Sequence, residues 1–199
     1  DLVVFTGSRD VGSKILTACG PDLKRVVLEL GGKDALIVLE DADIEAAANY
    51  AVQNSFRNSG QVCVSTERIY VEEAVADKFE NLVIEKTKEW KQGDPTDETV
   101  KIGPMVSSTQ RDMVLAQLDQ ALQDGAVLRC GGGTADNYIE PTVLTGCNHD
   151  MQIMHDETFG PICCIQRVSG DSDAVKHAND TPYGLGGAVY GEAEHAIEV

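Results

Sequence analysis

Cys63 ends a polar, glycine-containing loop, residues 58–63 with the sequence NSGQVC, and has the clearest capacity for chemistry in the chain. A thiol on such a loop is open to a small molecule, and nearby backbone N–H groups stabilise the thiolate, which is the nucleophilic form. The alternative is a small buried hydrophobe, as most cysteines are. Cys163 and Cys164, by contrast, lie in an apolar run and are predicted to pack in the core. The pattern favours Cys63 as the nucleophile.

Glu29 lies at the end of a predicted strand, in the sequence LELGGK, beside two glycines. Strand ends in α/β sheets open into the binding crevice, where a carboxylate can act as a general base. The alternative is a surface glutamate before an ordinary turn. Lys33, after the glycines, is predicted to be solvated. Glu29 is therefore a candidate base at a candidate crevice.

Two turns could bind a flat, phosphorylated cofactor. The first, FTGSRDVG at Phe5–Gly12, joins a predicted strand to a predicted helix, where small residues and the helix dipole suit a pyrophosphate. It is not GxGxxG, so an ordinary turn is the alternative. The second, DETFGP, has an acid, Glu157, that could bind ribose hydroxyls and an aromatic ring, Phe159, that could pack on a cofactor ring. Its alternative is a plain turn with Phe159 in the core.

Alternating strands and helices must position these residues, which predicts an α/β fold with a largely parallel sheet and flanking helices. The strands are predicted at residues 2–5, 25–29, 35–39, 68–71, 126–130, 138–144, 162–168 and 187–190. The helices are predicted at 11–19, from 41–43 to about 56, at about 74–90 and 108–123, and near 171–179, with a further helix at the end of the chain. The break at Leu30–Gly32 is a candidate domain border.

Composition excludes several classes of partner. The formal charge of −17 repels nucleic acid and anionic lipid surfaces, and no apolar run is long enough to span a membrane. The six cysteines are too sparse for a disulfide framework and form no CxxC pair, so we expect free thiols, no metal site and a reducing compartment such as the cytoplasm. The first and last residues both look like cut ends, so the lack of a targeting signal carries no information.

Together and in this order, these motifs resemble the NAD(P)-dependent aldehyde dehydrogenase superfamily. The matching segments are FTGSRDVG (Phe5–Gly12), LELGGK (Leu28–Lys33), FRNSGQVC (Phe56–Cys63), ETFGPI (Glu157–Ile162) and, less specifically, IEPTVL (Ile139–Leu144) and NDTPYGLGGAVY (Asn179–Tyr190). The likeness runs the whole length of the chain. It implies the end of a Rossmann-type cofactor domain over residues 1–31 and a catalytic domain, truncated at its C-terminal end, over residues 32–199.

The resemblance also implies roles for individual residues. Cys63 resembles the family's nucleophile and Glu29 its general base. For the cofactor, NAD or NADP, the resemblance implies that Gly7 and Ser8 lie against the diphosphate and Val11 near the adenine. It implies that Leu30 and Gly31 line the nicotinamide side. It further implies that Glu157 holds the nicotinamide ribose and that Phe159 packs beside the ring. The implied reaction oxidises a small-molecule aldehyde to a carboxylic acid through a thiohemiacetal and a thioester, and the implied full-length assembly is a homo-oligomer.

The sequence departs from the family pattern in ways that leave alternatives open. The family's second oxyanion donor, an asparagine, and the residues that select NAD or NADP precede Asp1, and Met113 occupies a position where relatives can carry a cofactor-contacting lysine. The 199 residues alone are therefore expected to be inactive or nearly so, and a non-catalytic binding module of the same fold is the alternative. A cysteine hydrolase is a third possibility, which requires one of His149, His155, His177 or His195 beside Cys63.

Overall fold

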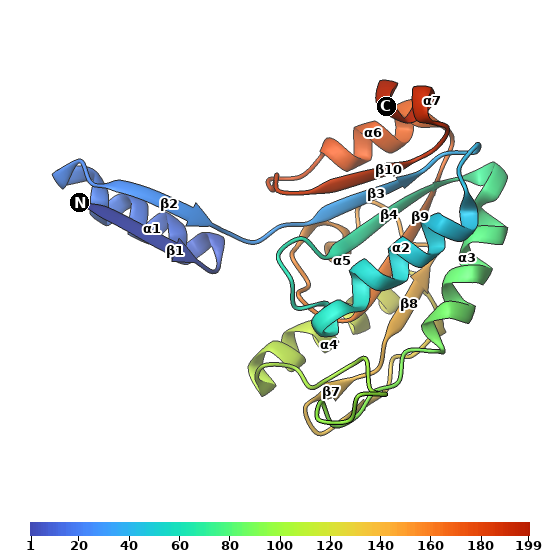
Figure 1. The fold of residues 1–199 in the computed structure, drawn as a ribbon, viewed down its shortest axis with the longest axis horizontal. Coiled ribbons are helices and arrows are strands. Elements are labelled where there is room, and N and C mark those ends of the chain that lie inside the picture. Colours follow the sequence, from blue (N-terminus) through green and yellow to red (C-terminus); the bar gives the residue numbers. More distant parts are fainter.

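A computed structural model describes all 199 residues, and its first unit is a small β–α–β arrangement. Strands β1 (Leu2–Thr6) and β2 (Arg25–Glu29) pair in parallel, with helix α1 (Arg9–Cys19) between them in the chain. Helix α1 begins two residues earlier than predicted because Ser8 caps it, its Oγ accepting from the N–H of Val11 at 3.4 Å. Figure 1 shows this unit beside the larger body, joined to it by one extended segment.

The larger body is built on a six-stranded sheet in the order β10-β3-β4-β9-β8-β5. All neighbours pair in parallel except β5 and β8, so the predicted α/β class with a largely parallel sheet is confirmed. The strands are β3 (Asp34–Val38), β4 (Thr66–Glu72), β5 (Val127–Cys130), β8 (Thr142–Thr145), β9 (Ile162–Val168) and β10 (Gly187–Tyr190). Strand β4 is buried throughout, as expected of a central parallel strand with helices on both faces.

Helices cover both faces of this sheet (Figure 1). Helices α2 (Ile44–Phe56) and α3 (Glu73–Thr87) enclose one apolar core against β3, β4 and β9. Helices α4 (Ser108–Gln123), α5 (Gln152–His155) and α6 (Asp171–Asn179) enclose a second core on the other face. The chain ends in α7 (Ala193–Glu198), the expected last helix. No helix has the length and apolarity that crossing a bilayer requires.

Besides shifts of one or two residues at element ends, three larger differences from the sequence prediction stand out. The strand expected over 138–144 is two strands, because Pro141 interrupts it between β7 (Tyr138–Ile139), which forms a hairpin with β6 (Thr134–Ala135), and β8. Helix α3 ends at Thr87, where the N–H of Trp90 bonds to the carbonyl of Thr87 in a tighter turn. The single turn α5 was not predicted, since four residues carry too little periodicity.

The pairing of β3 with β4 is irregular at its start. Asp34 pairs with Thr66 but Ala35 pairs with Arg68, so β4 carries one extra residue, Glu67, at this point. A β-bulge of this kind redirects the side chain of the extra residue and often occurs next to a functional site. On the β3 side the irregularity falls between Asp34 and Ala35, shortly after the glycine pair that joins the two units.

Candidate active site

A cavity of about 320 Å³ lies between the small unit and the larger body. The two sides of this cavity come from segments far apart in the sequence. Its lining residues are Thr6, Gly7, Ser8, Glu29, Leu30, Gly31, Cys63, Gln110, Met113, Glu157 and Phe159. The structure thus brings together all the site residues predicted from the sequence except Val11, which lies outside this lining on the first turn of α1.

Cys63 is half-buried in the turn that precedes β4, after a loop of unusual backbone conformation. Asn58, Ser59 and Gly60 have φ angles of 53°, 59° and 70°, in the left-handed region that side chains rarely adopt. At Gly60 a Cβ would lie 2.1 Å from the carbonyl oxygen of Gly160, so only glycine fits there. Backbone strain of this kind is concentrated at functional sites, where the surrounding structure enforces it.

Two side chains of this loop bond to the backbone of the segment before α4 and so hold the loop in place. Ser59 Oγ donates to the carbonyl of Gly103 at 2.9 Å, and Gln61 Oε1 accepts from the N–H of Val106 at 2.8 Å. On the opposite side, a Cβ at Gly32 would lie 2.6 Å from the carbonyl oxygen of Cys63. The glycine pair and the cysteine turn are therefore packed closely against each other.

Glu29 is the last residue of β2, and its side chain is exposed at the cavity. Its carbonyl accepts from the N–H of Gly7 at 3.0 Å, which fixes the turn after β1 beside it. Gly7 and Ser8 lie in that turn, at the N-terminus of α1, where the helix dipole is positive. A carboxylate, a thiol and a helix N-terminus thus open onto one cavity, although Glu29 and Cys63 are far apart in the sequence.

Glu157 is half-buried and reaches back to the glycine pair. Its Oε1 accepts from the N–H of Gly32 at 3.1 Å, and a Cβ at Gly31 would overlap its carboxylate at 2.4 Å. Burial raises the pKa of Glu157 above its usual range, and the hydrogen bond from Gly32 opposes this shift. The side chain therefore lies where a ligand between Gly31 and the cysteine turn would meet it.

Phe159 is half-buried in the cavity wall rather than in the core, so the plain-turn alternative for this segment does not describe its position. Its φ of 51° is also in the left-handed region. Gln110 Nε2 donates to the carbonyls of Thr158 and Phe159 at 3.0 and 3.2 Å. The turn that carries Phe159 is thus tied to the first turn of α4.

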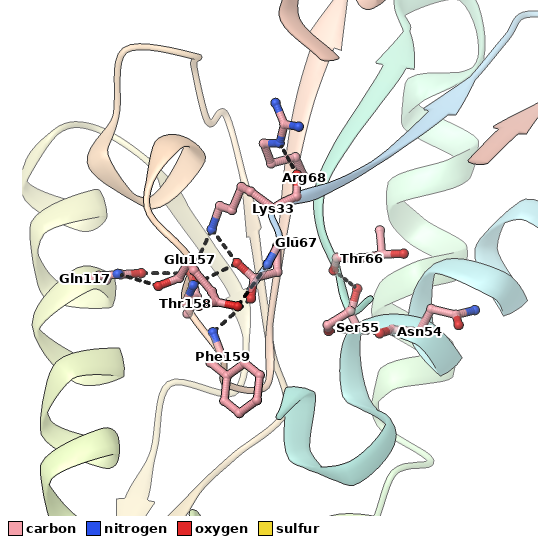
Figure 2. A network of polar contacts seen from close by, with 12 residues as sticks. Lys33, Asn54, Ser55, Thr66, Glu67, Arg68, Gln117, Glu157, Thr158 and Phe159 are labelled. Carbon is pink, nitrogen blue, oxygen red and sulfur yellow. Dashed lines mark hydrogen bonds and ion pairs between the residues drawn. The ribbon is translucent and has the colours of Figure 1, made fainter. Parts of the chain in front are cut away.

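Lys33 was predicted to be solvated, and this prediction was wrong. Its side chain is buried, with Nζ 2.6 Å from Oε2 of Glu67 and 2.9 Å from Oγ1 of Thr158 (Figure 2). A lysine is buried only where a partner compensates the loss of hydration. That partner lies 34 positions away along the chain.

Gln110 and Met113 line the cavity from α4. Met113 was singled out in the sequence by its position, whereas Gln110 was not identified as a contact residue. Gln110 follows the helix-capping Ser107 by three residues, the spacing of a capping box. Its amide instead bonds to the turn of Phe159, whereas Ser107 caps the helix by accepting from the N–H of Gln110 at 3.1 Å. The capping pattern was visible in the sequence, but the tertiary contact was not.

None of the four histidines lines the cavity with Cys63. His149, His155 and His177 cluster near Tyr70, whose Oη lies 3.0 Å from Nδ1 of His149. His195 lies away from this cluster, between Asp41 and Asp171, the first residue of α6. A cysteine hydrolase needs a histidine beside its nucleophile, so this arrangement argues against that alternative.

Comparison with known proteins gives a consistent result over the whole chain. The model of the aldehyde dehydrogenase family matches residues 1–199. Salicylaldehyde dehydrogenase of Pseudomonas sp. (strain C18) is 46% identical over 189 residues, which is 94% of this chain and 39% of that protein. Peroxisomal aminoaldehyde dehydrogenase 2 of Pisum sativum is 41% identical over 194 residues, 95% of this chain and 39% of that protein.

The fold agrees with solved structures as closely. The structure of Mycobacterium tuberculosis aldehyde dehydrogenase complexed with NAD+ superposes with a TM-score of 0.95 at 35% identity, covering 100% of this chain and 42% of that one. The chain therefore spans about two fifths of the length of the relatives it matches.

Proposed function

Because the chain belongs to the aldehyde dehydrogenase family, we propose that the protein oxidises an aldehyde to a carboxylic acid, with NAD or NADP as hydride acceptor. One observation carries the proposal: a single cavity is lined by Cys63, Glu29, the turn at Gly7 and Ser8, and Glu157. We place the border between a cofactor-binding part, residues 1–31, and a catalytic part, residues 32–199, at the glycine pair that separates the two sheets.

The residues around the cavity fit a dinucleotide. The turn at Gly7 and Ser8 presents a helix N-terminus, which favours a diphosphate. Glu157, already accepting a hydrogen bond from Gly32, has a second carboxylate oxygen free for ribose hydroxyls. The ring of Phe159 forms part of the wall, beside Leu30 and Gly31. When bound, the nicotinamide accepts the hydride that the aldehyde carbon loses.

Cys63 acts first in the proposed reaction. Its thiolate forms a C–S bond to the aldehyde carbon, and the carbonyl π electrons move to oxygen. The backbone N–H of Cys63 can donate to this oxyanion, as fixed dipoles do at acyl-transfer sites. Transfer of hydride from that carbon restores the C=O bond and leaves a thioester on Cys63.

Glu29 acts second. Its carboxylate accepts a proton from a water molecule as the water oxygen attacks the thioester carbon. The C–S bond breaks and the carboxylic acid leaves, while the proton held by Glu29 passes to the departing sulfur and restores the thiol of Cys63. The exposed end of β2 gives this carboxylate access to water, which the hydrolytic step consumes.

The substrate is a small-molecule aldehyde. Met113, Leu30 and Phe159 give the cavity apolar surface that could receive its carbon side. Two relatives are named as a salicylaldehyde dehydrogenase and an aminoaldehyde dehydrogenase, so both classes of aldehyde belong in a substrate panel. We further propose a homo-oligomer in a reducing compartment for the full-length protein.

The experiment follows NADH or NADPH formation by the full-length protein over an aldehyde panel, with Cys63→Ser as the test variant. We expect turnover to be lost while circular dichroism shows the fold retained. Cys130→Ser is the matched control, because Cys130 is also half-buried but lines no part of this cavity. Normal turnover by Cys63→Ser would contradict the proposal. The 199 residues alone should bind NAD weakly, and micromolar binding by calorimetry would overturn that expectation.

A further inference from the structure

We propose that Glu67 is a positioning residue for the turn at residues 157–159, through which it sets the cofactor-facing side of the cavity. Glu67 lines no part of the cavity itself and belongs to none of the motifs identified in the sequence. It is the extra residue of the bulge in β4. The inference rests on the proposed function, since it concerns how the cofactor side is held.

Both carboxylate oxygens of Glu67 bind the backbone of this turn. Oε2 accepts from the N–H of Thr158 and Oε1 from the N–H of Phe159, each at 2.8 Å (Figure 2). A carboxylate that accepts two adjacent backbone N–H groups fixes the orientation of the peptide between them. Glu67 therefore determines how the peptide joining Thr158 to Phe159 is oriented.

That peptide needs such support because Phe159 has a φ of 51°, which a bulky residue avoids. The opposite side of the turn is held as well. Gln110 Nε2 donates to the carbonyls of Thr158 and Phe159, and Gln117 Nε2 donates to the carbonyl of Glu157 at 3.2 Å. The donors Gln110 and Gln117 lie on α4, whereas the acceptor Glu67 lies on β4. The turn is clamped between the two elements.

Lys33 contacts both Glu67 and the turn. Its Nζ lies 2.6 Å from Glu67 and 2.9 Å from Oγ1 of Thr158, whose hydroxyl donates in turn to Oε1 of Gln117 at 2.8 Å. The neighbouring Gly32 donates its N–H to Glu157 at 3.1 Å. The segment at Gly32 and Lys33 thus contacts Glu157 and Thr158, and Glu67 extends the network to Phe159.

The expected consequence is specific to the cofactor. With glutamine at position 67 one N–H loses its acceptor and Lys33 loses its countercharge, so the turn relaxes and Glu157 and Phe159 move from their cavity positions. Loss of one correctly placed cofactor contact of hydrogen-bond strength reduces affinity about tenfold. The loop of Cys63 meets the end of this turn at Gly160, but Ser59 and Gln61 anchor it independently to Gly103 and Val106, so the reactivity of Cys63 should not change.

The experiment uses the full-length protein and three readouts: the dissociation constant for the cofactor that the wild type binds, the alkylation rate of Cys63 by iodoacetamide, and amide hydrogen exchange of the peptide containing residues 157–160. For Glu67→Gln we expect about a tenfold rise in the dissociation constant, faster exchange in that peptide and an unchanged alkylation rate. If this variant does not fold, Thr158→Val, which removes the hydroxyl bound to Lys33 and Gln117, is judged by the same three readouts.

Glu80→Gln is the matched control. Glu80 is also a buried glutamate paired with a cation, Arg167, but it lies on α3 at the opposite face of the sheet. It should lose stability without a change in cofactor affinity. Wild-type affinity or unchanged exchange in Glu67→Gln, or an equal loss of affinity in Glu80→Gln, would overturn the inference while the proposed function stands. A wild type that binds neither NAD nor NADP would instead overturn the proposed function itself.

Discussion

Lys33 and Glu67 form a buried ion pair, with Nζ and Oε2 2.6 Å apart and side-chain exposures of 0% and 4%. The two partners are not equivalent, because Glu67 also accepts two backbone N–H groups whereas Lys33 has only Thr158 as a further partner. Removing either leaves a different set of buried polar groups without partners. This asymmetry leads to the first prediction.

We expect Glu67→Leu to cost more stability than Lys33→Met. The first leaves a buried ammonium and two N–H groups without an acceptor, at about 3–5 kcal/mol. The second leaves a carboxylate that two N–H groups still stabilise, at about 1–3 kcal/mol. Urea unfolding of the full-length protein measures both, and Lys78→Met, an exposed lysine of α3, is the neutral control. The reverse order of the two losses would contradict the assigned network.

Glu29→Gln is expected to separate the two halves of the reaction. Acylation of Cys63 does not need the carboxylate, so a burst of reduced cofactor equal to the enzyme concentration should remain. Hydrolysis of the thioester should slow by about 10²–10⁴-fold, the usual contribution of a general base. Rapid mixing, followed by the absorbance of the reduced nicotinamide, resolves the two phases. Glu85→Gln serves as the control, and loss of the burst itself would contradict this role.

Gly60→Ala is expected to destabilise the protein and reduce turnover. Its φ of 70° alone costs a non-glycine residue about 1–3 kcal/mol, and the Cβ would also overlap the carbonyl oxygen of Gly160 at 2.1 Å. Gly20→Ala is the matched control, because its φ is −57° and nothing lies within 4 Å of a Cβ there. Thermal unfolding and steady-state turnover measure both variants. Equal melting temperatures for the two would show that the left-handed loop is not enforced.

The docking of α7 should depend on pH through His195. Hydrogen bonds to Asp171 and Asp41 raise the pKa of His195 from 6.5 to about 9 in the folded state. A raised pKa means that this stabilisation is complete below about pH 6.5 and is lost as the pH rises through about 9. The stability difference between the wild type and His195→Gln should therefore shrink between pH 7 and about 10, as chemical denaturation at several pH values measures. A difference that grows with pH would contradict the assignment.

The sequence predicted the elements well where periodicity and punctuation agree. The strands at Arg25–Glu29 and Ile162–Val168 and the helices at Ser108–Gln123 and Asp171–Asn179 have the predicted bounds. The prediction of one strand over 138–144 failed because Pro141 cannot donate to the ladder and divides the segment. Local patterns thus locate elements, because their causes are local.

The candidate site was predicted in its motifs but not in its supports. Cys63, Glu29 and Glu157 stood out by type and position, whereas Glu67 carried no signal. Its role depends on a bulge and on a lysine 34 positions away, and only the folded chain brings them together. Lys33 was misjudged for the same reason, because a single sequence does not reveal which carboxylate will compensate a buried ammonium.

The glycine pair at Gly31 and Gly32 has one further consequence. Glu29 precedes it on the small unit and Cys63 follows it on the larger body, so the backbone angles at these two positions set the gap between the carboxylate of Glu29 and the sulfur of Cys63. A Cβ on Gly31 would collide with Glu157, and one on Gly32 with the carbonyl of Cys63. The observed spacing of the proposed base and the proposed nucleophile therefore requires residues without side chains at the junction.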